Sequence, residues 1–241
     1  MTLMWEEAGW EPLADGVGRV RLPEWDCTAG LVVGADAALL VDAGASLAEG
    51  ARLRAAAERI AGRRVTHLAL THPHFDHVLG AAAFAGAEVY GAVGVAGVLA
   101  GAREELRADA VAHGLDAGAA ENAVDALVPV RHQVSGELAL DLGGGRRAVL
   151  ADAGPGHTGH DLAVLVPGAV EVVFCGDLVE ESGEPQAGPD AVPARWPAAL
   201  DRLLALGGAG ARYVPGHGAV VDAAFVRAQQ DALAARFGVS E

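Results

Sequence analysis

Four side chains that can bind a metal ion lie within six residues, at His72, His74, Asp76 and His77. They directly follow the apolar run 67–70, which predicts a buried strand. In an extended or turning segment, His72 and His74 project to the same side because side chains alternate along the backbone. Imidazoles and carboxylates are ligands that zinc and related divalent metals prefer. Such groups rarely crowd together without a partner, so the motif predicts a metal site.

The composition is that of an ordinary globular protein with a strong negative charge. Of 241 residues, 52% are hydrophobic and 20% are charged, and the formal net charge is −15. This length allows a substantial core. We expect no nucleic-acid partner, because binding to phosphates requires clustered Lys and Arg. Any anionic substrate would be attracted by bound metals rather than by the protein surface.

Several features predict a soluble, cytoplasmic protein without a membrane partner. Cys27 and Cys175 are far apart in the sequence, which indicates no disulfide framework and favours a reducing compartment. Residues 1–7 are acidic where a signal peptide would be basic, and no apolar segment follows. Gly, Asp or Arg interrupts every apolar run before it reaches the length of a transmembrane span.

The first half of the chain predicts short strands separated by Gly, Asp and Pro, at residues 16–22, 30–33, 37–41, 65–70 and 88–91. A capping box at Ser46 begins a helix that ends at Gly62, and a second helix is expected over 77–84. The strand at 65–70 carries the metal motif at its C-terminal end, where open α/β sheets usually place ligands.

The Ala-rich segment of about residues 93–127 predicts one or two helices. We interpret it as a helical insertion that forms a wall or lid of a substrate pocket. His113 and Glu121 within it are expected to be solvated, as charged groups on helices normally are.

The second half of the chain predicts strands again, at 128–134, 137–142, 147–151, 161–166, 170–175 and 211–214. Helices are expected over 196–206 and 221–237. No repeat, low-complexity linker or change of composition interrupts the chain, so residues 1–241 are expected to form a single domain. Both halves run strands then helices, which favours an α/β fold of two sheets packed face to face with helices outside.

Three later turns place further metal-binding side chains beside glycine at strand ends. They contain His157 and His160 (154–161), Asp177 (174–178) and His217 (214–218). Glycine lets the backbone turn sharply and approach a ligand cage closely. Each turn alone is weak evidence, but together with the first motif they supply two more histidines and a carboxylate for a second metal.

These motifs resemble those of the metallo-β-lactamase-fold hydrolases. The His-x-His-x-Asp-His loop is complete at 72–77, and further matches lie at Asp42, His157, Asp177 and His217. They follow the order of the family and cover about residues 15–220. The resemblance implies an αββα four-layer sandwich of the metallo-β-lactamase type, with two metal ions between the loops at one edge of the sheets.

The resemblance also implies a role for each of these residues. The first metal would be held by His72, His74 and His157, the second by Asp76, His77 and His217, with Asp177 bridging both. Asp42, which alone reads as a turn-former, would be hydrogen-bonded so as to orient the ligands. A water between the metals would lose a proton and become the nucleophile, and Asp76 would orient it and accept the proton. The expected cofactors are two Zn²⁺ per chain, with Fe or Mn as alternatives.

His160 is a second candidate catalytic residue. It lies three residues after His157, so its ring reaches the mouth of the pocket if that turn is tight; otherwise it is a surface or hydrogen-bonded histidine. Trp25 and Phe75 are expected to line the pocket. We expect core positions for Trp196, which could also line the pocket, and for Cys175.

The expected activity is hydrolysis of a small ester, lactone or thioester by a dinuclear metal centre. Asp177 stands where familiar zinc β-lactamases have a cysteine ligand, and Glu180 and Glu181 follow where a positive charge would help to bind a β-lactam. The motif at 72–77 instead resembles the glyoxalase II and lactonase branch, although only about one helix follows His217. Alternatives are a β-lactamase, a mononuclear iron sulfur-oxidising dioxygenase of the same fold, and a non-catalytic metal-binding domain. No oligomeric state is predicted.

Overall fold

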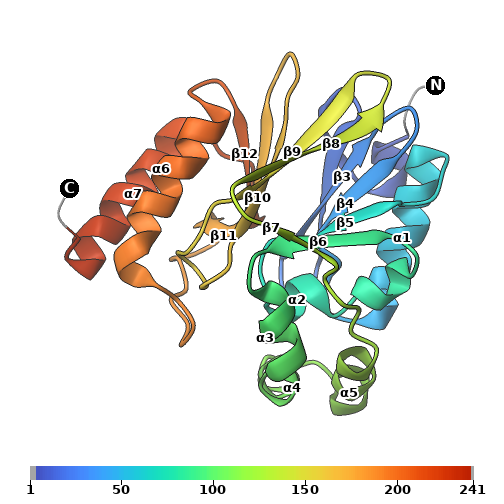
Figure 1. Cartoon of the computed structure of the whole chain (residues 1–241), viewed down its shortest axis with the longest axis horizontal. Helices are drawn as coiled ribbons and strands as arrows, with labels where there is room; N and C mark the ends of the chain where they lie inside the picture. The colour runs from blue at the N-terminus through green and yellow to red at the C-terminus, as the bar shows by residue number, and fades with distance from the viewer. Residues whose placement is uncertain (1–3, 240–241) are drawn as a thin grey trace.

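The computed structural model describes residues 4–239 and contains two β-sheets packed face to face, with helices on their outer sides (Figure 1). Helices α6 (Trp196–Gly207) and α7 (Ala223–Phe237) cover one sheet, and α1 (Leu47–Ala61) covers the other. The αββα sandwich expected from the sequence is therefore confirmed. No helix among residues 4–239 is long and apolar enough to cross a membrane.

The first sheet has seven strands in sequence order, β1 Glu11–Ala14, β2 Val17–Arg21, β3 Thr28–Val33, β4 Ala38–Val41, β5 His67–Ala69, β6 Glu88–Ala92 and β7 His132–Val134. Strands β1 to β4 pair antiparallel, and β4 to β7 pair parallel. The parallel part brings the C-terminal ends of β4, β5 and β6 to one edge, where α2 (Phe75–Val78) follows β5.

The second sheet has five strands in the order β12-β11-β10-β9-β8, with bounds β8 Glu137–Gly143, β9 Arg146–Asp152, β10 Leu162–Val166, β11 Val172–Glu180 and β12 Arg212–His217. Every residue of β10 and β11 is buried, as expected for continuous apolar runs between two layers. The ring of Phe174 on β11 occupies the space that a side chain at Gly30 on β3 would fill, so the two sheets meet closely there.

Shorter helices gather at one end of the molecule (Figure 1). They are α2 Phe75–Val78, α3 Val95–Gly101, α4 Arg103–Ala112 and α5 Ala117–Asp125. Three-residue or four-residue 3₁₀ helices lie at Glu6–Ala8, Ala81–Phe84 and Pro193–Arg195. The segment 93–127 thus forms three helices rather than one or two.

Other differences from the expected elements have local causes. The helix expected over 77–84 is two short helices, because the Gly80 N–H leaves the helical pattern and donates to the Gly44 carbonyl. The strand expected over 128–134 is confined to His132–Val134. Strand β1 was not predicted, and β11 continues past residue 175, which places Asp177 inside a strand.

The helix predicted after Ser46 is confirmed, and it supports the loop of the metal motif. The Ser46 hydroxyl accepts a hydrogen bond from the Glu49 N–H at 3.2 Å, and Gly62 ends the helix with a φ of 64°. One turn into α1, Gly50 packs against the backbone of Gly80, which follows α2. A side chain at Gly50 would overlap the Gly80 carbonyl, so this contact requires glycine.

Gly50→Ala is expected to destabilise the fold by about 1–3 kcal/mol, because the overlap with the Gly80 backbone outweighs the gain in helix propensity. Gly97→Ala is the matched control, since a side chain at this exposed position of α3 meets nothing within 4 Å. The control should gain about 0.5–1 kcal/mol. Urea denaturation measures both. A Gly50→Ala protein as stable as the Gly97→Ala protein would contradict the close contact.

Candidate metal centre

The seven expected ligands come together between the two sheets at one edge. The first four follow β5, whereas His157 lies in the turn between β9 and β10, Asp177 on β11, and His217 at the end of β12. All but His74 and His217 are buried. The local geometry thus joins four separate segments of the chain.

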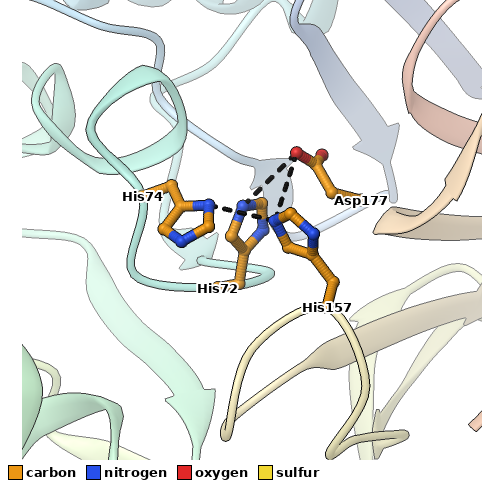
Figure 2. A group of neighbouring side chains, drawn as sticks. All are labelled: His72, His74, His157 and Asp177. Carbon is orange, nitrogen blue, oxygen red and sulfur yellow. Dashed lines mark hydrogen bonds and ion pairs between the residues drawn. The ribbon is translucent and has the colours of Figure 1, made fainter. Parts of the chain in front are cut away.

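One group consists of His72, His74, His157 and Asp177, whose ligand atoms lie within 4.8 Å of one another. Figure 2 shows these four side chains pointing toward a common centre. His74 Nδ1 is 3.0 Å from His157 Nε2, and Asp177 Oδ2 is 3.6 Å from His72 Nε2. His157 Nε2 is 3.5 Å from the same carboxylate oxygen. The group has the donor types of a zinc site.

A second group lies beside it and shares Asp177. His77 Nε2 is 3.2 Å from Asp177 Oδ1, and His217 Nε2 is 3.3 Å from Asp177 Oδ2. Asp76 Oδ2 lies 3.3 Å from His217 Nε2 and 3.6 Å from His77 Nε2. One carboxylate therefore reaches both groups, which is the arrangement that the sequence motifs implied.

Every histidine of the cluster has one ring nitrogen turned outward to a hydrogen-bond partner. The pairs are His72 Nδ1 with Thr71 Oγ1, His74 Nε2 with Asp190 Oδ2, His77 Nδ1 with Asp42 Oδ2, His157 Nδ1 with the Gln186 carbonyl, and His217 Nδ1 with the Trp25 carbonyl, at 2.8–3.1 Å. Carboxylate and carbonyl oxygens only accept, so the nitrogen facing them carries the proton.

The same reasoning fixes the tautomer of His72. The hydroxyl of Thr71 donates its proton to Asp42 Oδ2 at 2.8 Å, so it accepts from the Nδ1–H of His72. In the neutral form of each ring, the nitrogen facing the cluster then has a bare lone pair. His74 Nδ1 and His157 Nε2 are thus two acceptors 3.0 Å apart, an arrangement that needs a cation between them or a proton on one ring.

Two buried atoms of the cluster have no hydrogen-bond partner, His72 Nε2 and Asp177 Oδ1. An unpartnered buried polar atom is costly unless another group satisfies it. Gly216, next to His217, allows the carboxylate of Asp177 to lie in this position, because a side chain there would overlap Oδ1. The donor set, its geometry and these two atoms fit divalent metal ions.

Asp42 fixes the loop of the metal motif through hydrogen bonds. Its carboxylate accepts hydrogen bonds at 2.8 Å from the N–H and the hydroxyl of Thr71 and from His77 Nδ1. The residue is buried and has a φ of 60°, an unfavourable value for a residue other than glycine. Asp42 therefore orients His77 directly and His72 through Thr71, as a support for ligands and not only as a turn-former.

Burial and neighbouring charges shift the pKa values of these groups in opposite directions. Burial lowers the pKa of His157 to about 4 and holds the pKa of His72 well below its usual range. Burial also lowers the pKa of His217, but Asp177 and Asp76 outweigh it and raise the pKa to about 12. Burial raises the pKa of Asp177, but His77, His72 and His217 outweigh it and hold it well below its usual value. The Asp177 carboxylate is therefore ionised at neutral pH and attracts cations.

Cys27 lies beside the cluster, which the sequence did not indicate. Its Sγ is 3.3 Å from the Asp76 carbonyl and 3.6 Å from His77 Nδ1. Burial raises the pKa of this thiol to about 12. The protonated thiol therefore acts as a donor to the Asp76 carbonyl and not as a thiolate ligand. Asp190 and Gln186 were also missed, because a loop distant in sequence brings them to His74 and His157.

A cavity of about 940 Å³ opens onto the cluster and reaches His74, Asp76, His157, Asp177 and His217. Its apolar wall comes from α3 and α4, through Val98, Leu99, Ala102 and Leu106. A second wall is the segment 182–190, which follows β11. Of the three helices in the segment 93–127, α3 and α4 thus line this cavity, whereas α5 does not.

The remaining candidates have distinct positions. Trp25 and Phe75 line the cavity, with ring centroids 5.6 Å apart. Trp196 is fully buried in the core, with its ring centroid 5.4 Å from that of His157. His113 is exposed, as expected, and yet lines the cavity, where it stacks on Phe75. Cys175 is a buried core residue, and Glu121 is exposed.

His160 does not line this cavity. Its imidazole lies over Gly94 at the start of α3, in the space that a side chain there would fill. Its backbone N–H donates to the Thr158 hydroxyl at 3.0 Å. A catalytic role of His160 stays a prediction.

Comparison with known proteins agrees with this fold. A model of the metallo-beta-lactamase superfamily matches residues 22–217. No curated protein sequence matches the chain. Similar solved structures include the metallo-beta-lactamase FIM-1 from Pseudomonas aeruginosa in its mono-zinc form, at 20% identity and a TM-score of 0.71, with 96% of each chain covered.

A metallo-beta-lactamase from Pontibacter korlensis is 19% identical, with a TM-score of 0.72 over 93% of this chain and 97% of that one. Another, from Erythrobacter litoralis with beta-mercaptoethanol in its active site, is 18% identical, with a TM-score of 0.69 over 93% and 95%. At such identities the likeness establishes the fold alone. The match of the family model over residues 22–217 places this chain in the metallo-beta-lactamase superfamily.

Proposed function

We propose that this protein is a dinuclear metal-dependent hydrolase that cleaves a small ester, lactone or thioester. The observation that carries the proposal is the inward direction of five imidazole nitrogens in two groups that share one carboxylate. The superfamily consists mostly of metal-dependent hydrolases, which supports the general class of reaction. A small molecule is the partner that the cavity accommodates.

The ligand assignment follows the two groups. His72, His74 and His157 would hold one ion, Asp76, His77 and His217 the other, and Asp177 would contact both. Zinc is the metal we propose, because neutral imidazoles and carboxylates suit it. The chemistry that such ions supply when bound is an acidified water and a polarised substrate carbonyl.

The side chains of the cavity would position the reactants. The Asp76 carboxylate lines the cavity and lies against His77 and His217, where it can orient an attacking water and accept its proton. The ring of His217 is held by the Trp25 carbonyl, so its Nε2 keeps a fixed direction. The apolar wall from α3 and α4 would bury the acyl part of the substrate and exclude water.

Two observations favour an ester, lactone or thioester over a β-lactam. The residues lining the cavity include neither Lys nor Arg, the side chains that would best pair with the carboxylate of a β-lactam. The carboxylate of Asp177 is shared by both groups, which supports the glyoxalase II and lactonase branch. A sulfur-oxidising iron enzyme of the same fold is the alternative, and metal content distinguishes the two.

The first test is metal analysis by inductively coupled plasma mass spectrometry, together with turnover of ester, lactone and thioester panels. We expect about two zinc ions per chain, and Asp76→Ala is expected to lose metal and reduce kcat/KM at least ~100-fold while the fold is retained. His160→Ala is the control and should retain both metals. About one iron per chain with little zinc, or full activity of Asp76→Ala, would refute the proposal.

Asp190→Ala is expected to weaken metal binding about 10–100-fold, because His74 would lose the carboxylate that holds its Nε2–H. Asp190→Asn keeps an acceptor at this position and should lose less. Competition with a chromophoric chelator measures both affinities. Asp201→Ala, which removes an exposed carboxylate from α6, is the control and should bind metal as the wild type does. Wild-type affinity of Asp190→Ala would show that this contact does not orient His74.

A further inference from the structure

We propose that the cavity selects substrates with a cationic ammonium group next to an apolar portion, and disfavours anionic ones. This inference rests on the proposed hydrolase function and names the substrate class of that site. It is carried by the sign of the charges that surround the cavity and by the apolar and aromatic surface between them.

Five carboxylates line the cavity besides Asp76 and Asp177, at Glu105, Asp109, Glu180, Glu184 and Asp190. They come from both walls, two from α4 and three from β11 and the segment after it. Some are engaged: Asp190 contacts His74, Asp109 contacts His113, and Glu180 accepts from Ser182. Within residues 4–239, the side chains of Glu105 and Glu184 form no ion pair, so no cationic side chain is bound to either of these two lining residues.

Neither lysine nor arginine offsets these carboxylates. The chain contains no lysine, and none of its 17 arginines lines the cavity. The two arginines of α4 are turned to other partners, Arg103 to the Val124 carbonyl and Arg107 to Glu104. Arg236, which reaches the segment after β11, donates to the Pro185 carbonyl. A carboxylate or phosphate on the substrate would therefore find no partner on the walls.

Bound metal ions would not change the sign of the charge at the mouth of the cavity, which would stay negative. Two divalent ions would be partly neutralised by Asp76 and Asp177 and lie at the base of the cavity, whereas Glu105 and Glu184 are exposed residues of its walls. Like charges across a cleft disfavour a ligand, and a cleft lined by one sign of charge raises the local concentration of the opposite sign. The walls of the cavity thus attract cations, while the metal centre at its bottom would activate an ester.

The apolar surface defines the rest of the ligand. Val98, Leu99 and Leu106 form a wall beside Glu105, and Trp25 and Phe75 line the same cavity. Aromatic rings attract ammonium groups that have lost part of their hydration shell. Carboxylates together with aliphatic and aromatic side chains favour a substituted ammonium, which has an apolar surface and a diffuse charge.

The test compares three thioacetates of similar size by release of their thiol. These are the cationic ester of thiocholine, its uncharged 3,3-dimethylbutyl analogue and the anionic ester of 3-mercaptopropionate. We expect kcat/KM to fall in that order, with the cationic ester favoured about 10-fold over the uncharged one. Equal rates for the cationic and anionic esters would refute the charge selection and leave the hydrolase function intact.

A pair of charge-matched variants assigns the preference to the walls of the cavity. Glu105→Gln combined with Glu184→Gln should reduce the ratio of cationic to uncharged kcat/KM about 3–10-fold. Glu7→Gln combined with Glu137→Gln removes the same charge from exposed positions that do not line the cavity, and should keep the wild-type ratio. The same loss in both variants would mean that net charge, not the cavity, sets the preference.

A binding measurement keeps the inference testable if no thioester is cleaved. Calorimetric titration of the metal-loaded protein with benzyltrimethylammonium and with benzoate compares two small aromatic ions of opposite charge. We expect the cation to bind more tightly, and the Glu105→Gln and Glu184→Gln protein to lose that preference. Tighter binding of benzoate would overturn the inference. Binding of the cation without hydrolysis of any ester would refute the proposed function alone.

Discussion

The carboxylate of Asp177 lies buried among histidine rings, and one of its oxygens has no hydrogen-bond partner. An ionised group in this position is stable only if positive charge lies close to it. Of the rings beside it, His77 and His217 can supply that charge, because surrounding acidic groups raise their pKa against the effect of burial, whereas burial holds the pKa of His72 and His157 below its usual range. Four segments of the chain are thus arranged around a carboxylate that requires positive charge close to it. The two groups of metal-binding side chains share this carboxylate for the same reason.

The sequence predicted most of this centre because its ligands are carried by short motifs. The strand before His72 and the glycine beside His217 have clear local signals, and so does the capping box of α1. The architecture followed from the alternation of strands and helices in both halves. The short helices around the metal loop could not be predicted in detail, because Gly80 leaves the helical pattern for a contact with Gly44 that is distant in sequence.

The groups that orient the ligands were mostly invisible in the sequence. Asp42 could be named from its resemblance to a family motif, but Asp190 and the Gln186 carbonyl have no local signal of their own. Both belong to a segment without regular structure between β11 and α6, and their role depends on where that segment folds. A backbone carbonyl, such as that of Trp25 against His217, can come from any residue type, so no sequence pattern marks it.

This arrangement couples the pocket to the metal centre. The loop that carries Trp25 and the segment that carries Asp190 each do two things, since they line the cavity and hold the outer nitrogen of a ligand histidine. A change of loop conformation that admits a different substrate would also turn His217 or His74. By contrast, Glu105 and the apolar residues of α3 and α4 line the cavity, and among residues 4–239 none of them holds a ligand histidine by a side-chain hydrogen bond. Substrate preference can therefore change through the helical wall, which carries the exposed Glu105, at little cost to metal binding.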